Sequence, residues 1–418
     1  MKKIKLIGPF KQLLPMTGLP LRGALQDEEL LIIEDGGVLV EDNVIYATGR
    51  FTDLMSQAKT LNAELVTLTG DVVCLPGFID THTHICFGGS RANDYAMRNA
   101  GKSYLEIAKA GGGIWDTVTQ TRKASKEQLT TGIVARANRH LRHGVTTIEV
   151  KSGYGLSVDE ELKMLRAIKT ADKNIPASLI PTCLAAHMFP KDYNGTAEEY
   201  LSEIATSLFP KLKEEQLTNR VDAFIEESAF SQEVIRPYFE KAVSMGFDIT
   251  VHADQFSTGG SEIAVEIGAI SADHLEASTE KEINLLASSN VIATALPGAS
   301  MGLGCNYTPG RKILDAGGTL AIASDWNPGS APMGNLLMQA TVFGTFEKLT
   351  NLEILAGITT RAAAALKLTD RGSLEVGHLA DLTIFPTHDY KEILYQQGML
   401  IPSMVWKEGD LVFNGQKA

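Results

Sequence analysis

Short apolar runs alternate with amphipathic stretches through the middle of the chain. The amphipathic stretches repeat their apolar residues at helical spacing, for example over 158–170, 197–213, 232–245 and 260–267. The apolar runs predict eight strands, at 74–81, 145–150, 177–184, 222–226, 248–252, 269–273, 291–295 and 319–324. Strands that alternate with helices in this way predict an α/β fold, specifically a (β/α)8 TIM barrel.

A doubly wound sheet is the alternative to the barrel. That fold would need a glycine-rich phosphate turn after its first strand. The nearest candidate, Gly302-Leu303-Gly304, comes late in the chain and lacks the third glycine, so we favour the barrel.

The two ends of the chain differ from the middle and resemble each other. Residues 28–50 and 372–415 are short strand-like runs broken by glycine and Asn/Asp turns. They predict a small β-sandwich-like domain built from both termini. We therefore expect a composite β-domain of residues 1–73 and 368–418, and a barrel domain of residues 74–367.

Composition and charge narrow the possible environments and partners. The chain has 418 residues, 44% of them hydrophobic, which is enough for a large core. Its net charge is −12 and no basic stripe interrupts it, so nucleic acid and anionic membranes are poor partners. No apolar stretch reaches transmembrane length, the N-terminus lacks a signal-peptide pattern, and none of the four cysteines forms a Cys-x-x-Cys pair. We expect a cytoplasmic protein with reduced thiols.

The first predicted strand ends in two histidines, His82 and His84, whose i, i+2 spacing puts both side chains on one face. Barrel sites lie at the carboxyl ends of the strands. Five of the nine histidines fall at such ends: His82, His84, His187, His252 and His274. Any one of them could be a structural histidine, but together they predict a metal and substrate site.

Asp325 ends the eighth predicted strand and could complete the metal site. A bound divalent ion lowers the pKa of its water to about 7 and needs a nearby carboxylate to accept the proton. Asp325 can ligate and can take that proton. The simpler alternative is a turn or helix cap ahead of Asn327-Pro328-Gly329.

These motifs resemble the amidohydrolase superfamily over the whole chain. The resemblance rests on Pro-Gly-Phe-Ile-Asp-x-His-x-His at 76–84, the histidines that end strands 5 and 6, Asp325, and the segment 372–382. Within the superfamily the chain most resembles the imidazolonepropionases, through residues 87–91, 151–155, 185–187, 271–275 and 325–330.

The resemblance implies that a metal-activated water hydrolyses 4-imidazolone-5-propanoate to N-formimidoyl-L-glutamate, a step of histidine degradation. It implies one zinc or iron ion per subunit, a homodimer, and Asp325 and His274 as catalytic residues. The implied metal ligands are His82, His84, His252 and Asp325. The implied substrate contacts are Arg91, Tyr154, His187, Gln255, Asn327, Gly329 and Ser330, and Tyr104, more simply a helix-packing aromatic, could cap the same pocket.

Gln255 departs from the related deaminases, which place a glutamate proton shuttle three residues after the strand-5 histidine. A glutamine cannot titrate, so proton transfer falls to Asp325, helped by His274. The segment Glu226-Glu227-Ser228 stands where binuclear relatives carry a carboxylated lysine, which argues against a second ion. Asp254 should point to the opposite face of its strand and be structural.

Several alternatives stay open at this stage. A deaminase or another cyclic-amide hydrolase would need a titratable group at position 255. A non-catalytic relative would have lost ligands, and none is missing. Lys151 is either a cation of the site or a buried partner of Glu149 or Glu226, and Gly111–Gly113 is a candidate gate over the site.

Overall fold

The middle of the chain forms an eight-stranded parallel sheet in the order β13-β12-β11-β10-β9-β8-β7-β6. The computed structural model describes residues 2–226 and 229–415, except for the side chains of Tyr104, Leu105 and Ala108. A parallel bridge between Thr83 and Trp326 brings the two edges of the sheet together. The predicted barrel is confirmed, with strands β6 (Phe78–Asp80), β7 (Val145–Lys151), β8 (Ser178–Ala186), β9 (Arg220–Ala223), β10 (Asp248–Ala253), β11 (Ser271–His274), β12 (Ile292–Ala295) and β13 (Leu320–Ile322).

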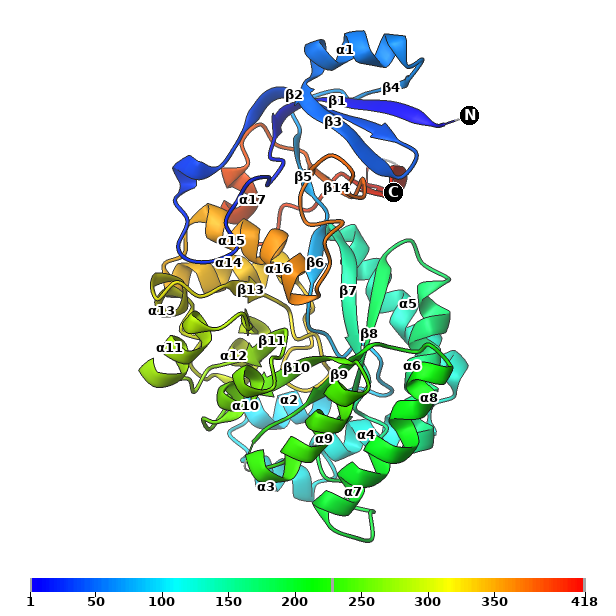
Figure 1. Ribbon diagram of the computed structural model, residues 1–418, viewed down its shortest axis with the longest axis vertical. Coiled ribbons are helices and arrows are strands. Elements are labelled where there is room, and N and C mark those ends of the chain that lie inside the picture. The colour runs from blue at the N-terminus through cyan, green and yellow to red at the C-terminus, as the bar shows by residue number, and fades with distance from the viewer. Residues whose placement is uncertain (1, 227–228, 416–418) are drawn as a thin grey trace.

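Helices follow the strands and surround the sheet (Figure 1). Several begin at a Ser or Thr whose hydroxyl accepts from the first turn, as Ser125 does from the Gln128 N–H. The outer helices are α5 (Lys126–Arg142), α6 (Val158–Asp172), α7 (Ala197–Glu203), α8 (Phe209–Glu214), α9 (Gln232–Ser244), α10 (Gly260–Glu266), α11 (Glu280–Ser288), α12 (Pro297–Leu303), α13 (Gly310–Asp315), α14 (Leu336–Glu347), α15 (Asn351–Gly357) and α16 (Thr360–Ala365). None of the described helices is both long and apolar enough to cross a bilayer.

The helix predicted over 197–213 contains a π-helical segment, Ile204–Leu208, between α7 and α8. Pro210 stands in the first turn of α8. Proline has no N–H to donate to the carbonyl four residues back, so the helical hydrogen-bond pattern has to shift near it. Periodicity alone does not reveal this change of register.

The prediction of a single strand over 74–81 is wrong, because this segment forms two strands that belong to two different sheets. β5 (Val73–Pro76) pairs with β1 and β14 of the terminal sheet, and β6 lies in the barrel. Gly77 joins them where a Cβ would lie 2.2 Å from Thr146 Oγ1. Both halves are fully buried, so the sequence shows one unbroken apolar run. Residues 74–76, assigned above to the barrel domain, therefore pair within the terminal sheet.

Both chain ends contribute to a second, mixed sheet, as predicted. Its order is β16-β15-β14-β5-β1-β2-β3, with β4 beside β1, and Figure 1 shows it at the opposite end of the molecule from α2–α4. Alternate residues of β1 face different cores: Leu6 packs with Leu54 of α1, and Ile7 with Trp406 of β15. The elements are β1 (Ile4–Leu13), η1 (Asp27–Glu29), β2 (Ile33–Glu41), β3 (Val44–Arg50), α1 (Phe51–Thr60), β4 (Glu64–Thr67), β14 (Leu382–Phe385), α17 (Lys391–Tyr395), β15 (Met404–Lys407) and β16 (Asp410–Asn414).

The connection from β6 to β7 carries three further helices, α2 (Ala92–Asn99), α3 (Tyr104–Lys109) and α4 (Ile114–Lys123). They lie at the end of the barrel away from the terminal sheet (Figure 1). The four cysteines are all free, as expected of reduced thiols, and only Cys305 is exposed.

Candidate metal centre and substrate site

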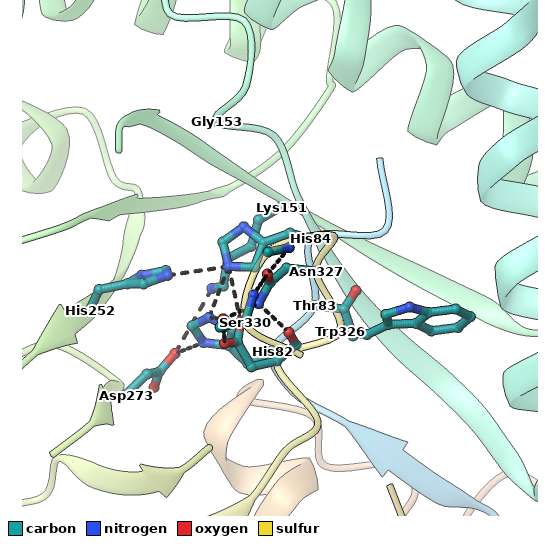
Figure 2. Close-up of polar contacts among 12 residues, drawn as sticks. His82, Thr83, His84, Lys151, Gly153, His252, Asp273, Trp326, Asn327 and Ser330 are labelled. Carbon is teal, nitrogen blue, oxygen red and sulfur yellow. Dashed lines mark hydrogen bonds and ion pairs between the residues drawn. The ribbon is translucent and has the colours of Figure 1, made fainter. Parts of the chain in front are cut away.

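Three buried histidines from two strands meet at the carboxyl end of the barrel. Nε2 of His84 lies 3.2 Å from Nε2 of His82 and 3.3 Å from Nε2 of His252. Figure 2 shows the three rings turned toward one another. They are the one group of three or more possible metal ligands found among the described residues. The predicted convergence of these histidines is confirmed.

Two carboxylates hold the outer nitrogens of two of these rings. Nδ1 of His82 lies 2.6 Å from Oδ2 of Asp273, and Nδ1 of His252 lies 2.9 Å from Oδ2 of Asp222. A proton on each Nδ1 directs the lone pair of each Nε2 into the cluster. Sequence reasoning assigned no role to Asp222 or Asp273. The available signal was a carboxylate within each of two short buried strands, β9 and β11.

Asp325 approaches the same point from the end of β13. Its Oδ1 lies 3.4 Å from His84 Nε2 and 3.7 Å from His82 Nε2. Asp325 has a φ of +49°, which directs the chain sharply away from the strand. Burial opposes ionisation of this carboxyl group, but His84, His274 and His252 outweigh it and lower the pKa of Asp325.

The cluster suits a divalent cation. Burial is the main cause that holds the pKa of His82 well below its ordinary value, and burial lowers the pKa of His252 to about 4. Neutral imidazoles offer Nε2 lone pairs, directed into the cluster in His82 and His252 by the carboxylates at Nδ1, and the Asp325 carboxylate joins them. Buried acceptors without a donor between them repel one another unless a cation lies among them.

His274 and His187 flank the cluster. The ring centroid of His274 is 5.3 Å from that of His252, and its Nδ1 is 3.5 Å from Oε1 of Glu276. Burial lowers the pKa of His274, but Glu276, Asp325 and Asp273 outweigh it and raise that pKa above 6.5.

His187 stacks on His84 with 5.3 Å between ring centroids, and its Nδ1 lies 2.9 Å from the Gly153 carbonyl oxygen. The Tyr154 ring lies 5.9 Å from His84 and 5.4 Å from His187. Tyr154 and His187 therefore form an aromatic wall next to His84.

Arg91 lies beside the loop that follows Asp325. A Cβ on Gly329 would be 3.1 Å from Nη1 of Arg91, so the absence of a side chain there permits this approach. Nε of Arg91 donates to Oδ2 of Asp94, and the Gly113 N–H donates to the same oxygen over 2.8 Å. Asp94 thus ties the guanidinium to the glycine-rich segment that sequence reasoning singled out as a gate.

Asn327 and Ser330 build this loop. Oδ1 of Asn327 accepts from the N–H groups of Gly329 and Ser330, both over 2.8 Å, and its Nδ2 donates to the Asp325 carbonyl oxygen over 2.7 Å. The Ser330 hydroxyl lies 3.5 Å from Oδ2 of Asp325. The side-chain amide of Asn327 is therefore committed to the shape of the loop.

The remaining predicted residues differ in their placement. Gln255 is half-buried in the bend after β10, and no polar contact joins it to the other described residues of the site. Tyr104 begins α3, but its side chain is outside the described residues, as are Glu227 and Ser228. Asp254 accepts from Ser261 and Ser278, away from the histidines, which confirms its structural role.

Lys151 is buried inside the barrel below the histidines. Its Nζ lies 2.8 Å from Oε1 of Glu149 and 2.8 Å from Oδ2 of Asp222. Burial lowers the pKa of Lys151, but the surrounding carboxylates outweigh it and raise that pKa. Of the two alternatives left open by the sequence, the structure supports a buried partner, with Glu149 rather than Glu226.

Known proteins match this chain in sequence and in fold. The profile of the amidohydrolase family matches residues 73–412. An imidazolonepropionase of Bacillus cytotoxicus is 40% identical over 404 residues, covering 95% of this chain and 94% of the relative. One of Bacillus cereus is 40% identical over 387 residues, covering 92% and 90%.

Solved structures share the fold at low sequence identity. A triazine hydrolase variant superposes with a TM-score of 0.76 at 17% identity, covering 98% of this chain and 95% of that one. A zinc-bound adenosine deaminase from Xanthomonas campestris superposes with a TM-score of 0.71 at 18% identity, covering 98% and 93%. The chain belongs to the amidohydrolase family, and within it to the imidazolonepropionases.

Proposed function

We propose that this enzyme hydrolyses the cyclic amide of 4-imidazolone-5-propanoate to N-formimidoyl-L-glutamate with the residues of the strand-end cluster and the Arg91 loop. The observation that carries the proposal is their adjacency. Ser330 lies next to Asp325, and Gly329 lies next to Arg91, so an acid–base carboxylate and a guanidinium share one site. The names of the 40% identical relatives support the same reaction.

One zinc or iron ion would be held by His82, His84, His252 and Asp325. Such an ion lowers the pKa of a water and polarises a carbonyl group. Zinc in the solved relatives with this fold supports a metal ion without deciding between zinc and iron.

Asp325 moves the proton in this mechanism. It accepts a proton from the water whose oxygen attacks the ring carbonyl carbon. As the carbon–nitrogen bond breaks, it returns that proton to the departing ring nitrogen. A carboxylate whose pKa is lowered is ionised at neutral pH and is therefore ready to act as the base.

His274 stabilises the charge that develops on the carbonyl oxygen. Its raised pKa favours the protonated imidazolium, and Glu276 beside Nδ1 fixes the orientation of the ring. The opposite nitrogen, Nε2, is then free to donate toward the substrate oxygen.

Arg91 binds the propionate carboxylate, since a planar guanidinium matches a carboxylate with two parallel hydrogen bonds. Tyr154 and His187 form the wall against which the planar ring stacks, and Gln255 orients the ring through its amide. Asn327, Gly329 and Ser330 shape the loop that holds Arg91 close to the acid–base group.

The test is turnover of the proposed substrate. Purified enzyme is mixed with freshly made 4-imidazolone-5-propanoate, the loss of its ultraviolet absorbance is followed, and the product is identified by mass spectrometry. We expect N-formimidoyl-L-glutamate, activity that a chelator removes, and recovery on adding zinc or iron. Release of ammonia from aminated heterocycles without turnover of the imidazolone would replace this proposal with a deaminase.

A further inference from the structure

The barrel interior below the histidines is charged, although barrel interiors are usually filled by branched apolar side chains. Lys151, Glu149, Asp222 and Asp273 are all within 1% of complete burial there. They come from three different strands, β7, β9 and β11. Buried charged side chains are costly to the fold unless each has a partner, so the partners of these four residues indicate their role.

We propose that Lys151 is a positioning residue of the metal centre, which holds Asp222 and Asp273 so that these two carboxylates fix the rings of His252 and His82. The proposal deepens the proposed function and rests on it, since it presumes that these histidines hold an ion. In this proposal the Lys151 side chain acts through the two carboxylates and not on the substrate. Figure 2 shows Lys151 and Asp273 beside the histidines.

The contacts pass through the same oxygen atoms. Oδ2 of Asp222 lies 2.8 Å from Lys151 Nζ and 2.9 Å from His252 Nδ1. Oδ2 of Asp273 lies 3.9 Å from Lys151 Nζ and 2.6 Å from His82 Nδ1. The Lys151 ammonium group therefore lies between the two oxygens that face the rings of His252, on β10, and His82, after β6. It is in direct contact with the Asp222 oxygen and farther from that of Asp273, to which the Thr250 hydroxyl also donates over 3.2 Å.

Neighbouring groups fix Lys151 itself. Its Nζ donates to Oε1 of Glu149 over 2.8 Å, and the Thr182 hydroxyl donates to the same oxygen over 2.5 Å. Its backbone N–H donates over 2.9 Å to the carbonyl of Thr83, the residue between His82 and His84. Side chain and backbone of Lys151 thus both support the ligand segment.

The direction in which metal affinity changes when Lys151 is replaced distinguishes a positioning role from simple charge repulsion. A lysine cation close to a divalent ion repels it, so removing the charge alone would tighten metal binding. Loss of positioning has the opposite result, because carboxylate partners of ligand histidines typically contribute about 10- to 100-fold in metal affinity.

The experiment compares Lys151→Met with Lys407→Met in the full chain. Lys407 is a matched control, a buried lysine paired over 2.9 Å with Asp381 in the terminal sheet. Each protein is stripped of metal, and Zn²⁺ affinity is measured in competition with a chromophoric chelator. The visible spectrum of the Co²⁺ form reports ligand geometry, and circular dichroism reports folding. We expect Lys151→Met to bind Zn²⁺ about 10- to 100-fold more weakly with an altered Co²⁺ spectrum, and Lys407→Met to match the wild type.

A second variant allows the same test if Lys151→Met does not fold. Lys151→Met/Glu149→Gln removes one positive and one negative charge together, and we expect the same loss of affinity. In an Asp222→Asn/Asp273→Asn background, Lys151→Met should cause no further loss of Zn²⁺ affinity, because the carboxylates through which Lys151 acts are already replaced. Equal or tighter Zn²⁺ binding by the folded Lys151 variants, or a fully additive loss, would overturn the inference. A wild type that binds neither zinc nor iron would instead overturn the proposed function.

Discussion

The histidine cluster and the loop around Arg91 belong to one proposed site but are built in different ways. His82, His84 and His252 lie on or directly after barrel strands, and partners on neighbouring strands secure two of the rings. Arg91 and Gly329 lie on connections between strands and helices, where Asp94 and Asn327 hold them through local hydrogen bonds. The strand side is constrained by neighbouring barrel strands, whereas the loop side is constrained by hydrogen bonds within and between connecting segments, such as that from Arg98 to the Gly329 carbonyl. The proposed function therefore assigns the chemistry to the part built on strands and substrate choice to the part built on loops.

The largest effect should come from Asp325, which belongs to both parts. Asp325→Asn keeps the size of the side chain but removes the proton acceptor. We expect kcat to fall by about 10²- to 10⁴-fold, the scale of general acid–base catalysis. Metal content is measured on the same samples, and Ser330→Ala shows how much of the loss comes from removing the hydroxyl that contacts Asp325 Oδ2 and Asn327 Nδ2. An active, metal-loaded Asp325→Asn enzyme would remove Asp325 as the proton carrier.

Arg91→Ala tests the loop side. A hydrogen bond to a charged group contributes about 1.5–3 kcal/mol, so KM should rise roughly 10- to 150-fold with a smaller change in kcat. Arg98 donates only to the carbonyls of Gly302 and Gly329, so Arg98→Ala reports the cost of loosening the loop alone. A KM equal to that of the wild type in Arg91→Ala would exclude Arg91 from the substrate pocket.

Asp273→Asn tests the strand side. It weakens the partner of His82 Nδ1, and we expect metal affinity to fall by about 10- to 100-fold, measured by competition with a chelator. Asp254→Asn is the matched control, since the Asp254 carboxylate is similarly buried but accepts from Ser261 and Ser278 instead of a histidine. Equal metal affinity of the two variants would show that metal binding does not depend on the contact between the Asp273 carboxylate and His82.

Gly329→Ala should have a smaller effect on the loop side. The new Cβ would lie 3.1 Å from Arg91 Nη1, so the guanidinium must move by a few tenths of an ångström. We expect KM to rise by less than about tenfold, since even a 1 Å misplacement costs about 10²-fold. In an Arg91→Ala background the substitution should be silent, and a further rise in KM there would show that Gly329 acts independently of Arg91.

The smallest effect is expected at Gln255. Gln255→Glu introduces a titratable group where related deaminases carry one, whereas the proposed mechanism assigns proton transfer to Asp325. We expect kcat/KM within about tenfold of the wild type, less than the removal of a general base would cost. Complete loss of turnover would show that the neutral amide makes a contact that a carboxylate cannot.

Periodicity alone identified much of this protein. The alternation of apolar runs and amphipathic stretches predicted the barrel, because strand and helix spacings differ and barrel sites lie at the carboxyl ends of strands. It therefore placed five histidines and Asp325 at strand ends, and the resemblance to a known family then selected His82, His84, His252 and Asp325 among them as metal ligands. It could not divide residues 74–81 between two sheets, because both halves are equally buried.

Only the tertiary structure decided which charges meet inside the barrel. The two-residue repeat of a strand tells which face carries Lys151. It does not tell which of several carboxylates on other strands lies opposite, because that depends on the register of the strands around the barrel. The same limit hid the roles of Asp222 and Asp273. Sequence determined which residue types reach the strand ends, and the packing of non-adjacent strands decided which of them hold the histidines in place.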